Sequence, residues 1–207
     1  MAVSFDLFGT LVDADRPADP WTAVADALTK RGVTVPDDWE AAYRSSHRDY
    51  ERGHEAALDE HVRLALASRD TEVTADTARS AVLAAFDRRV EVRDGARDAL
   101  AAAGECGPVA VCSNCSVPGL VERTLERADV DAAPDTVVTS VNCGWRKPHR
   151  EIFAATAAAL DVPLPELVHV GDDARTDGGA ARVGARSILL GDRTLDAVAT
   201  RLREGAL

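Results

Sequence analysis

The stretch "SFDLFGTLVD", residues 4–13, places a single carboxylate, Asp6, at the end of a short apolar run. A run of this length is typical of a buried strand, and a strand is predicted from Ala2 to Asp6. Gly9 and Thr10 then break the apolar pattern, as expected for a turn. In open parallel sheets ligands bind beyond the carboxyl ends of the strands, so Asp6 is a candidate site residue.

The second half of the chain alternates short apolar runs with helical patterns. Strands are predicted at residues 108–113, 135–141, 167–171 and 186–191, and helices at residues 119–128, 151–160, 177–183 and 195–202. This alternation predicts an α/β fold in which helices cover both faces of a parallel sheet.

Residues 17–89 differ, because they show helical periodicity and no convincing strand. Helices are predicted there at residues 21–31, 38–52, 58–68 and 75–88. A helical block between the first strand and the rest of an α/β fold indicates an insertion. We therefore expect an inserted cap domain of residues 17–89 and a core domain of residues 1–16 and 90–207.

The charge of the chain is strongly negative, with 35 acidic and 24 basic residues and a net charge of −11. This balance argues against a nucleic-acid partner, which would require a basic surface. Only Lys30 and Lys147 are lysines, and the other basic residues are arginines. A surface that is acidic and poor in lysine indicates a halophilic protein in a salt-rich cytoplasm, and a GC-rich genome is the alternative explanation.

The chain shows no sign of a membrane segment or a redox site. No apolar run approaches the ~20 residues that cross a bilayer, and no secretory signal is visible, so a cytoplasmic location is expected. Cys112 and Cys115 form a C-x-x-C pair, but no second pair or histidine at ligand spacing completes a zinc site. We expect these cysteines to be buried apolar residues.

Polar residues follow each predicted strand of the core. Ser113 and Asn114 end the second strand, Lys147 and Pro148 follow the third, and "GDD", residues 171–173, ends the fourth. Since the carboxyl ends of parallel strands meet at one edge of the sheet, we expect these groups to converge near Asp6.

This ordered set resembles the motifs of the haloacid dehalogenase superfamily of hydrolases, most of which are phosphatases. The first motif of that family is a strand, an aspartate and then Gly-Thr, which Asp6, Gly9 and Thr10 match. Ser113, Lys147-Pro148 and Gly171-Asp172-Asp173 with Asp177 match the other three motifs in order. The resemblance implies a Rossmann-like α/β core, a helical cap inserted after the first motif, and a Mg²⁺-dependent hydrolase of a small phosphorylated metabolite.

The resemblance also implies roles for individual residues. Asp6 resembles the family nucleophile, which becomes an aspartyl phosphate, and Mg²⁺ is implied at Asp6, the backbone carbonyl of Phe8 and Asp172. The residues implied around the phosphoryl oxygens are Thr10, Ser113, Asn114 and Lys147, and the implied supporting residues are Asp173 and Asp177. The alternatives are that Asp172 or Asp173 caps the next helix, that Ser113 is a turn residue, and that Asp177 is a helix-start charge.

Lys147 is a candidate on grounds independent of the family. The chain uses arginine at almost every basic position and places Arg146 directly before this lysine. An ammonium is a compact point charge, whereas a guanidinium is a wide planar fork, so a narrow site between Asp6 and a phosphoryl group favours lysine. The alternative is a surface cation.

Phe8 departs from the family pattern, because phosphatases of the family usually have a second aspartate at this position as general acid and base. Three readings are open: a phosphatase with a substitute for that acid, a 2-haloacid dehalogenase, and a catalytically degenerate binding module. The acidic "GDD" segment speaks against the dehalogenase, and the intact Asp6 and Lys147 speak against the degenerate module. The candidates for a substitute acid are Asp13, Asp15, His47, His54 and His61.

The physiological substrate and the oligomeric state are not predicted from the sequence. Tyr43, His47 and Tyr50 share one face of the helix predicted at residues 38–52. That face either lines the site or packs inside the cap.

Overall fold

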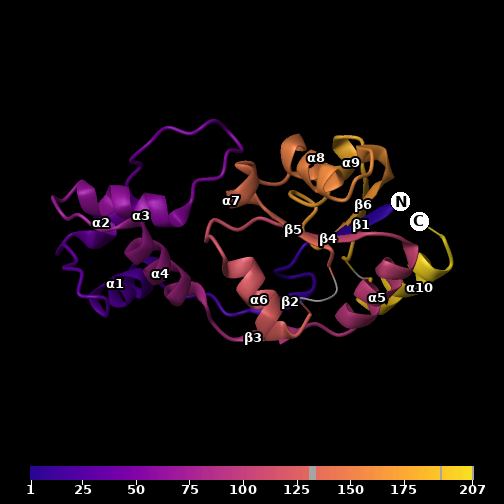
Figure 1. Cartoon of the computed structure of the whole chain (residues 1–207), viewed down its shortest axis with the longest axis horizontal. Coiled ribbons are helices and arrows are strands. Elements are labelled where there is room, and N and C mark those ends of the chain that lie inside the picture. Colours follow the sequence, from indigo (N-terminus) through magenta and orange to yellow (C-terminus); the bar gives the residue numbers. More distant parts are fainter. Residues whose placement is uncertain (131–133, 192, 207) are drawn as a thin grey trace.

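A parallel five-stranded sheet forms the centre of the protein, with the strand order β5-β4-β1-β6-β7. The computed structural model describes residues 1–130, 134–191 and 193–206. The strands of this sheet are β1 (Ala2–Phe5), β4 (Val109–Ser113), β5 (Thr136–Thr139), β6 (Leu167–Gly171) and β7 (Arg186–Leu189). Figure 1 shows helices on both sides of these strands.

Helices cover both faces of the sheet because alternate strand residues point to opposite sides. Val3 and Phe5 of β1 belong to the larger apolar cluster, which includes residues of three helices: α5 (Ala96–Cys106), α6 (Leu120–Ala128) and α10 (Leu195–Arg203). Ala2 and Ala110 belong to the second cluster, with residues of α8 (Arg150–Ala159) and α9 (Gly179–Arg182). All four residues of β1 are buried, and Asp6 directly follows this buried strand.

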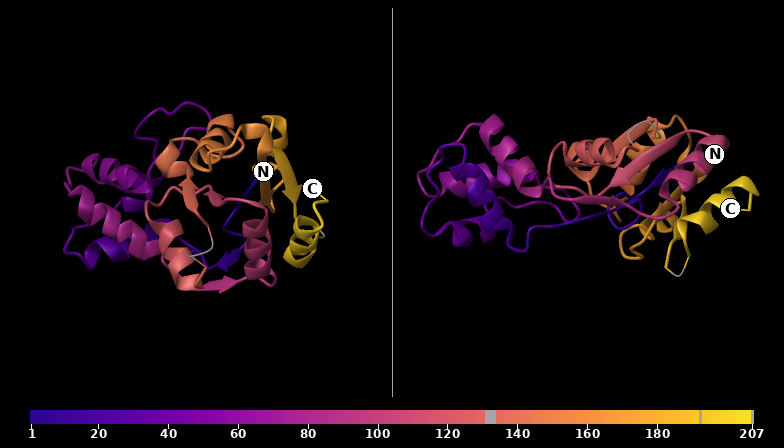
Figure 2. Two further views of the ribbon diagram at one scale, coloured as in Figure 1. Left: turned by 45° about the vertical axis from the view of Figure 1, so that its right-hand side comes forward. Right: turned by 90° about the horizontal axis from the view of Figure 1, so that it is seen from below.

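Four further helices form a bundle beside the sheet, which the views in Figures 1 and 2 show from several sides. They are α1 (Pro20–Thr29), α2 (Trp39–Arg44), α3 (Leu58–Ala67) and α4 (Ala75–Phe86). Residues 17–89, all of which the structure describes, contain these helices and no strand. The short antiparallel pair of β2 (Val12–Ala14) and β3 (Val90–Val92), which the sequence did not predict, lies where the chain leaves and re-enters the core.

Some predicted elements are shorter in the structure, and two of them end at a serine or threonine side chain. The helix predicted at residues 38–52 ends at Arg44, because Ser45 is extended and its hydroxyl donates to the carbonyl of Ala41. His47 and Tyr50 therefore lie beyond α2 and do not share a helical face with Tyr43.

The strand predicted at residues 135–141 ends at Thr139. The hydroxyl of Thr139 accepts a hydrogen bond from the backbone N–H of Asn142 and caps the short helix α7 (Ser140–Cys143). A threonine at a helix N-cap satisfies a backbone donor that the helix itself cannot satisfy. The segment is rich in residues that favour strands, so the pattern predicted a continuous strand and not a helix N-cap at Thr139.

The cysteines predicted to be buried apolar residues are buried in the structure. Cys112 and Cys115 are free thiols with exposed fractions of 0% and 7%. Burial raises the pKa of each of these two thiols to about 11, so both stay protonated near neutral pH.

Candidate active site

Polar groups from several strand ends converge at the carboxyl edge of the sheet. Asp6 follows β1, Ser113 ends β4, and Asp172 follows β6. Lys147 lies on the segment between α7 and α8, and its side chain contacts Asp6. The predicted convergence at this edge is therefore seen for these side chains.

The ammonium of Lys147 is held by three acceptors. Its Nζ lies 2.8 Å from Asp6 Oδ1 and 2.7 Å from Asp177 Oδ1, and it donates to the backbone carbonyl of Cys112 at 2.8 Å. Lys147 is only 2% exposed, so it is not a surface cation. Because an ammonium has three donors, this arrangement uses all of them and fixes the position of the charge.

The same contacts keep Lys147 charged. Burial alone would lower the pKa of its ammonium, but the nearby carboxylates of Asp6 and Asp177 outweigh this effect and raise the pKa above its ordinary value. A permanently charged lysine beside Asp6 provides a fixed positive charge where a phosphoryl group would accumulate negative charge.

Asp177 is fully buried and makes contacts beyond Lys147. Its Oδ1 lies 3.0 Å from His169 Nε2, and its Oδ2 accepts a hydrogen bond from the backbone N–H of Asp173 at 3.0 Å. Burial acts to raise the pKa of Asp177, but the hydrogen bond from His169 and the charge of Lys147 hold it well below its ordinary value. A Cβ at Gly171 would lie 2.2 Å from Asp177 Cγ, so only glycine allows this carboxylate to approach β6.

His169 is a residue that the sequence analysis missed. It lies on β6, is 0% exposed, and its Nδ1 is 2.9 Å from the hydroxyl of Ser4 on the neighbouring strand β1. Burial lowers the pKa of His169, which favours the neutral ring. The signal in the sequence was a histidine inside the otherwise apolar strand "LVHVG", residues 167–171.

Asp6, Asp172 and Asp177 form a group of carboxylates that could hold a metal ion. One oxygen from each lies within 4.8 Å of the others. Burial and the charge of Asp6 raise the pKa of Asp172, although a hydrogen bond from the Thr10 hydroxyl at 3.0 Å opposes this shift. Gly9 has a φ of +87°, and a Cβ there would meet Asp172 Oδ2 at 2.8 Å, so the turn after β1 requires glycine.

Three further candidates have different surroundings. Ser113 is fully buried, and its Oγ has no hydrogen-bond partner in the described part of the chain. The side-chain amide of Asn114 donates to the carbonyl of Lys147 and accepts from its backbone N–H, so it fixes the backbone that carries the lysine. The carboxylate of Asp173 pairs with Arg175 at 3.0 Å and lies outside the group of three acids.

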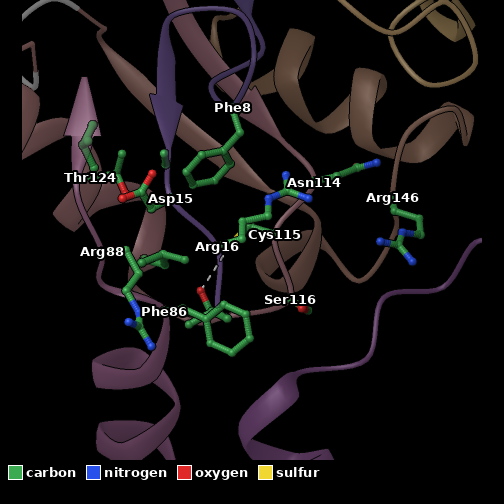
Figure 3. A pocket seen from close by; sticks show the side chains of 14 residues that line it. Phe8, Asp15, Arg16, Phe86, Arg88, Asn114, Cys115, Ser116, Thr124 and Arg146 are labelled. Atoms are coloured by element: carbon green, nitrogen blue, oxygen red, sulfur yellow. Dashed lines mark hydrogen bonds between the residues drawn. The ribbon is translucent and has the colours of Figure 1, made fainter. Parts of the chain in front are cut away.

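Phe8 lines a pocket of about 230 Å³ next to these residues. Figure 3 shows Phe8 with other side chains that line this pocket, among them Asp15 and Asn114. Of the five substitute acids considered from the sequence, Asp15 is the one that lines the pocket. Asp13 pairs with Arg93 instead, at 3.9 Å.

The three histidines among these candidates make contacts elsewhere. The rings of His47 and His61 donate hydrogen bonds from Nε2 to the backbone carbonyls of Ala42 and Tyr43 in the helical bundle. The ring of His54 stacks on Tyr50 and meets Trp145 edge-on. These contacts give the histidines structural roles outside the pocket.

Residues 1–184 match the family described as haloacid dehalogenase-like hydrolases. A relative from Xenopus laevis, "Haloacid dehalogenase-like hydrolase domain-containing protein 3", is 38% identical over 102 residues, which are 48% of this chain and 41% of the relative. The matched region thus spans less than half of that curated relative.

Solved structures share the fold. A HAD phosphatase from Thermococcus onnurineus has a TM-score of 0.60 at 21% identity, over 99% of this chain and 97% of the other. CbbY from Rhodobacter sphaeroides, in complex with phosphate, has a TM-score of 0.58 at 21% identity, over 91% and 84%. L-2-haloacid dehalogenase from Xanthobacter autotrophicus has a TM-score of 0.55 at 23% identity, over 99% and 82%.

The family match agrees with the resemblance noted in the sequence. In the described part of the chain, no helix has the length and apolar character needed to cross a membrane. Because the family match covers most of the sequence, the chain belongs to the haloacid dehalogenase-like hydrolases.

Proposed function

We propose that the protein is a Mg²⁺-dependent phosphatase of a small phosphorylated metabolite, with Asp6 as the nucleophile. The observation that carries this proposal is the contact of Asp6 with the buried Lys147, beside the acidic group of Asp172 and Asp177. A carboxylate nucleophile, a fixed cation and a set of oxygen ligands are the parts that phosphoryl transfer requires.

Asp6 performs the first step through one of its two oxygens. Lys147 contacts Oδ1, and we assign attack on phosphorus to Oδ2. The Asp6–phosphorus bond forms while the bond from phosphorus to the leaving oxygen breaks, which gives an aspartyl phosphate. Water then attacks phosphorus, releases phosphate and restores the Asp6 carboxylate.

The charges around Asp6 fit a divalent cation. Asp6, Asp172 and Asp177 carry three negative charges, and Lys147 supplies one positive charge while burial favours a neutral His169. The group is therefore left with an excess of two negative charges, and oxygen ligands are those that Mg²⁺ prefers. We propose that Asp6, Asp172 and the backbone carbonyl of Phe8 hold the ion, which would offset the repulsion between Asp6 and a phosphate dianion.

Ser113 is proposed to bind a phosphoryl oxygen, with Thr10 holding Asp172 in place. Lys147 is proposed to attract the phosphoryl group by its charge and to exchange one of its three contacts in the protein for a phosphoryl oxygen. The partnerless hydroxyl of Ser113 supports its part in the proposal, because a buried hydroxyl without a partner is costly unless a ligand supplies one. Asn114 is proposed to act indirectly, because its two hydrogen bonds to the backbone of Lys147 hold the lysine in position.

The leaving group needs a proton that Phe8 cannot supply. We propose that the natural leaving group departs without one or receives it from Asp15, the one carboxylate among the residues that line the adjacent pocket. Residues 17–89 act in this proposal as a cap, since Phe86 at the end of α4 and Phe8 in the core line the same pocket.

A 2-haloacid dehalogenase is the second candidate, and Phe8 is the observation that favours it. A dehalogenase expels halide without protonation and so has no use for an acid at this position. The three neighbouring carboxylates count against it, because they would only add negative charge beside a carboxylate substrate.

A metal-dependence assay on phosphate esters, acyl phosphates and 2-haloacids tests the proposal. We expect hydrolysis of a phosphate compound with Mg²⁺ and loss of activity in excess chelator. Asp6→Asn should abolish turnover, whereas the matched control Asp173→Asn changes an exposed carboxylate outside the acidic group and should retain most of it. Halide release that persists in chelator would instead establish the dehalogenase.

A further inference from the structure

The pocket next to Asp6 is lined in part by residues that lie close in the chain to the proposed reactive residues. Phe8 lies two positions after Asp6, Asn114 directly follows Ser113, and Arg146 directly precedes Lys147, and all three line the pocket. A phosphoryl group held at Asp6 and Lys147 would therefore place its leaving group in or near this space. The chemistry of the pocket wall then indicates the chemistry of the leaving group.

One part of the wall is apolar. Figure 3 shows the rings of Phe8 and Phe86 at opposite ends of the drawn side chains. The other apolar residues with larger side chains in the lining are Val90, Val117 and Leu120. Apolar side chains of this kind bind the carbon skeleton of a ligand by removing it from water.

The rest of the wall is positively charged, although the whole chain has a net charge of −11. Arg16, Arg88 and Arg146 line the pocket, and Asp15 is the one acidic residue among the lining residues. Three guanidinium groups against one carboxylate make this an anion-attracting surface in an otherwise acidic protein. These arginines come from three different segments of the chain.

Two of these three charges have no ion-pair partner in the described part of the chain. Across residues 1–130, 134–191 and 193–206, Arg16 and Arg88 form no ion pair, and the neighbouring Asp87 is already bound by Arg123 and Arg127. Arg146 Nε lies 3.5 Å from Glu55 Oε2, longer than a normal charged hydrogen bond. All three arginines are exposed enough to meet a ligand.

We propose that the substrate is a phosphate monoester whose leaving group has a small apolar body and a second anion, a carboxylate or a second phosphoryl group. This inference rests on the proposed function, because it assumes that Asp6 receives the phosphoryl group. The apolar body lies between Phe8 and Phe86, and the second anion contacts Arg16 and Arg88. The pocket volume of about 230 Å³ is below the ~300–1,000 Å³ of sites for drug-sized ligands, which favours a leaving group smaller than a nucleoside.

Matched aryl phosphates test this inference. The pair is para-(carboxymethyl)phenyl phosphate and para-(hydroxyethyl)phenyl phosphate, in which a carbon spacer keeps the acidity of the two phenols nearly equal. A third substrate, para-(phosphonomethyl)phenyl phosphate, distinguishes a phosphorus-centred second anion from a carboxylate. A charged hydrogen bond contributes about 1.5–3 kcal/mol, so we expect kcat/KM to favour an anionic substrate over the neutral one by tenfold or more.

Two variants and a control connect that preference to the pocket. Arg88→Gln and Arg16→Gln should each lower the anionic-to-neutral ratio of kcat/KM, and the double variant should bring it close to one. Arg182→Gln removes the same charge from an exposed position on helix α9, outside the pocket lining, and should leave the ratio unchanged. Thermal unfolding of each variant checks that the fold is retained.

A binding measurement separates this inference from the proposed function. Calorimetry with para-hydroxyphenylacetate and its neutral alcohol analogue reports on the pocket without any phosphoryl transfer. If no phosphate compound is hydrolysed but the acid binds in a manner that requires Arg88, the proposed function is wrong and the anion site stands. If phosphate esters are hydrolysed with no preference for a second anion, and Arg88→Gln changes neither turnover nor binding of the acid, the inference is overturned.

Discussion

Lys147 Nζ lies 2.8 Å from Asp6 Oδ1 although the two residues are 141 positions apart, and the lysine is only 2% exposed. Few other side chains fit this position, because the ammonium must also reach Asp177 and the carbonyl of Cys112. The sequence already marks the position, since Lys147 is one of only two lysines. The contact links the residue that would attack phosphorus to the charge that would stabilise the transferred group.

Lys147→Arg should therefore be damaging even though it keeps the charge. A planar guanidinium is too wide to replace an ammonium among three converging acceptors, so Asp6 and Asp177 would be displaced. A displacement of about 1 Å can cost roughly 10²-fold in rate, and we expect a loss of kcat of at least that order. Steady-state kinetics beside thermal unfolding measures both effects, and Lys30→Arg is the matched control at the other lysine.

Asp172→Asn should remove the metal response without unfolding the protein. Burial and the charge of Asp6 raise the pKa of Asp172. When no cation is bound, the ionised Asp172 is therefore repelled by Asp6. Without Mg²⁺, the Asp172→Asn protein is thus expected to unfold at the same temperature as wild type or above it. Mg²⁺ at 100 times its Kd should stabilise wild type by about 2.7 kcal/mol and leave the variant unchanged. An equal Mg²⁺-induced shift in both proteins would place the ion elsewhere.

His169→Leu should lower both stability and kcat, because it removes one hydrogen-bond partner of the buried Asp177 carboxylate and the partner of the buried Ser4 hydroxyl. The expected stability loss is about 1–3 kcal/mol. His169→Gln can donate to Asp177 through its amide and should restore part of the kcat. If the leucine and glutamine variants have the same kcat at equal stability, His169 has no part in positioning Asp177.

The stability of the wild-type protein should also depend on pH through His169. Burial lowers the pKa of His169 in the folded protein, whereas the unfolded chain takes up a proton near the ordinary value of 6.5. The unfolded state therefore binds more protons in this window, and the free energy of unfolding falls as pH drops below about 6.5. The decrease stops once pH passes below the folded pKa. Denaturant titrations of wild type and His169→Gln should differ in this slope.

Phe8→Asp tests whether the missing acid limits the rate. Without an acid at position 8, the wild-type protein should hydrolyse acyl phosphates and nitrophenyl phosphate much faster than alkyl phosphates. The variant should raise the rate on alkyl phosphates, since a general acid contributes typically 10²–10⁴-fold. Phe8 packs against the apolar cluster, so a stability loss is expected as well, and Phe8→Asn is the control for it. Equal wild-type rates on both substrate types, with chemistry rate-limiting, would mean that another group such as Asp15 already donates the proton.

The sequence predicted the sheet and the position of Asp6 because both depend on local patterns. Apolar runs bounded by polar residues gave the strands, and β6 was predicted with its observed limits, Leu167–Gly171. The same reasoning extended the helix after Asp38 and the strand after Thr136 too far. In both cases the element ends where a serine or threonine side chain forms a hydrogen bond with the backbone. Such a bond competes with the regular backbone hydrogen bonds, and a periodic pattern in the sequence does not reveal it.

The side-chain contacts inside the site could not be predicted from the sequence. His169 forms its hydrogen bonds with Ser4 and Asp177, and the pairing with Ser4 depends on the register of β1 against β6. The preference of Asp173 for Arg175 likewise depends on how the turn after β6 is folded. Strand register and turn geometry arise from packing between distant segments, and the identity of a residue alone does not set them.

Chemical trapping of the Asp6 side chain tests the central claim most directly. Aspartyl phosphate is an acyl phosphate, which borohydride reduces to homoserine, so quenching the enzyme during hydrolysis of nitrophenyl phosphate would mark the nucleophile. Peptide mass spectrometry should then find homoserine at position 6 in wild type with Mg²⁺ and substrate, and none in protein without substrate. Steady hydrolysis with Asp6 unmodified, or with the modification at another aspartate, would contradict the account.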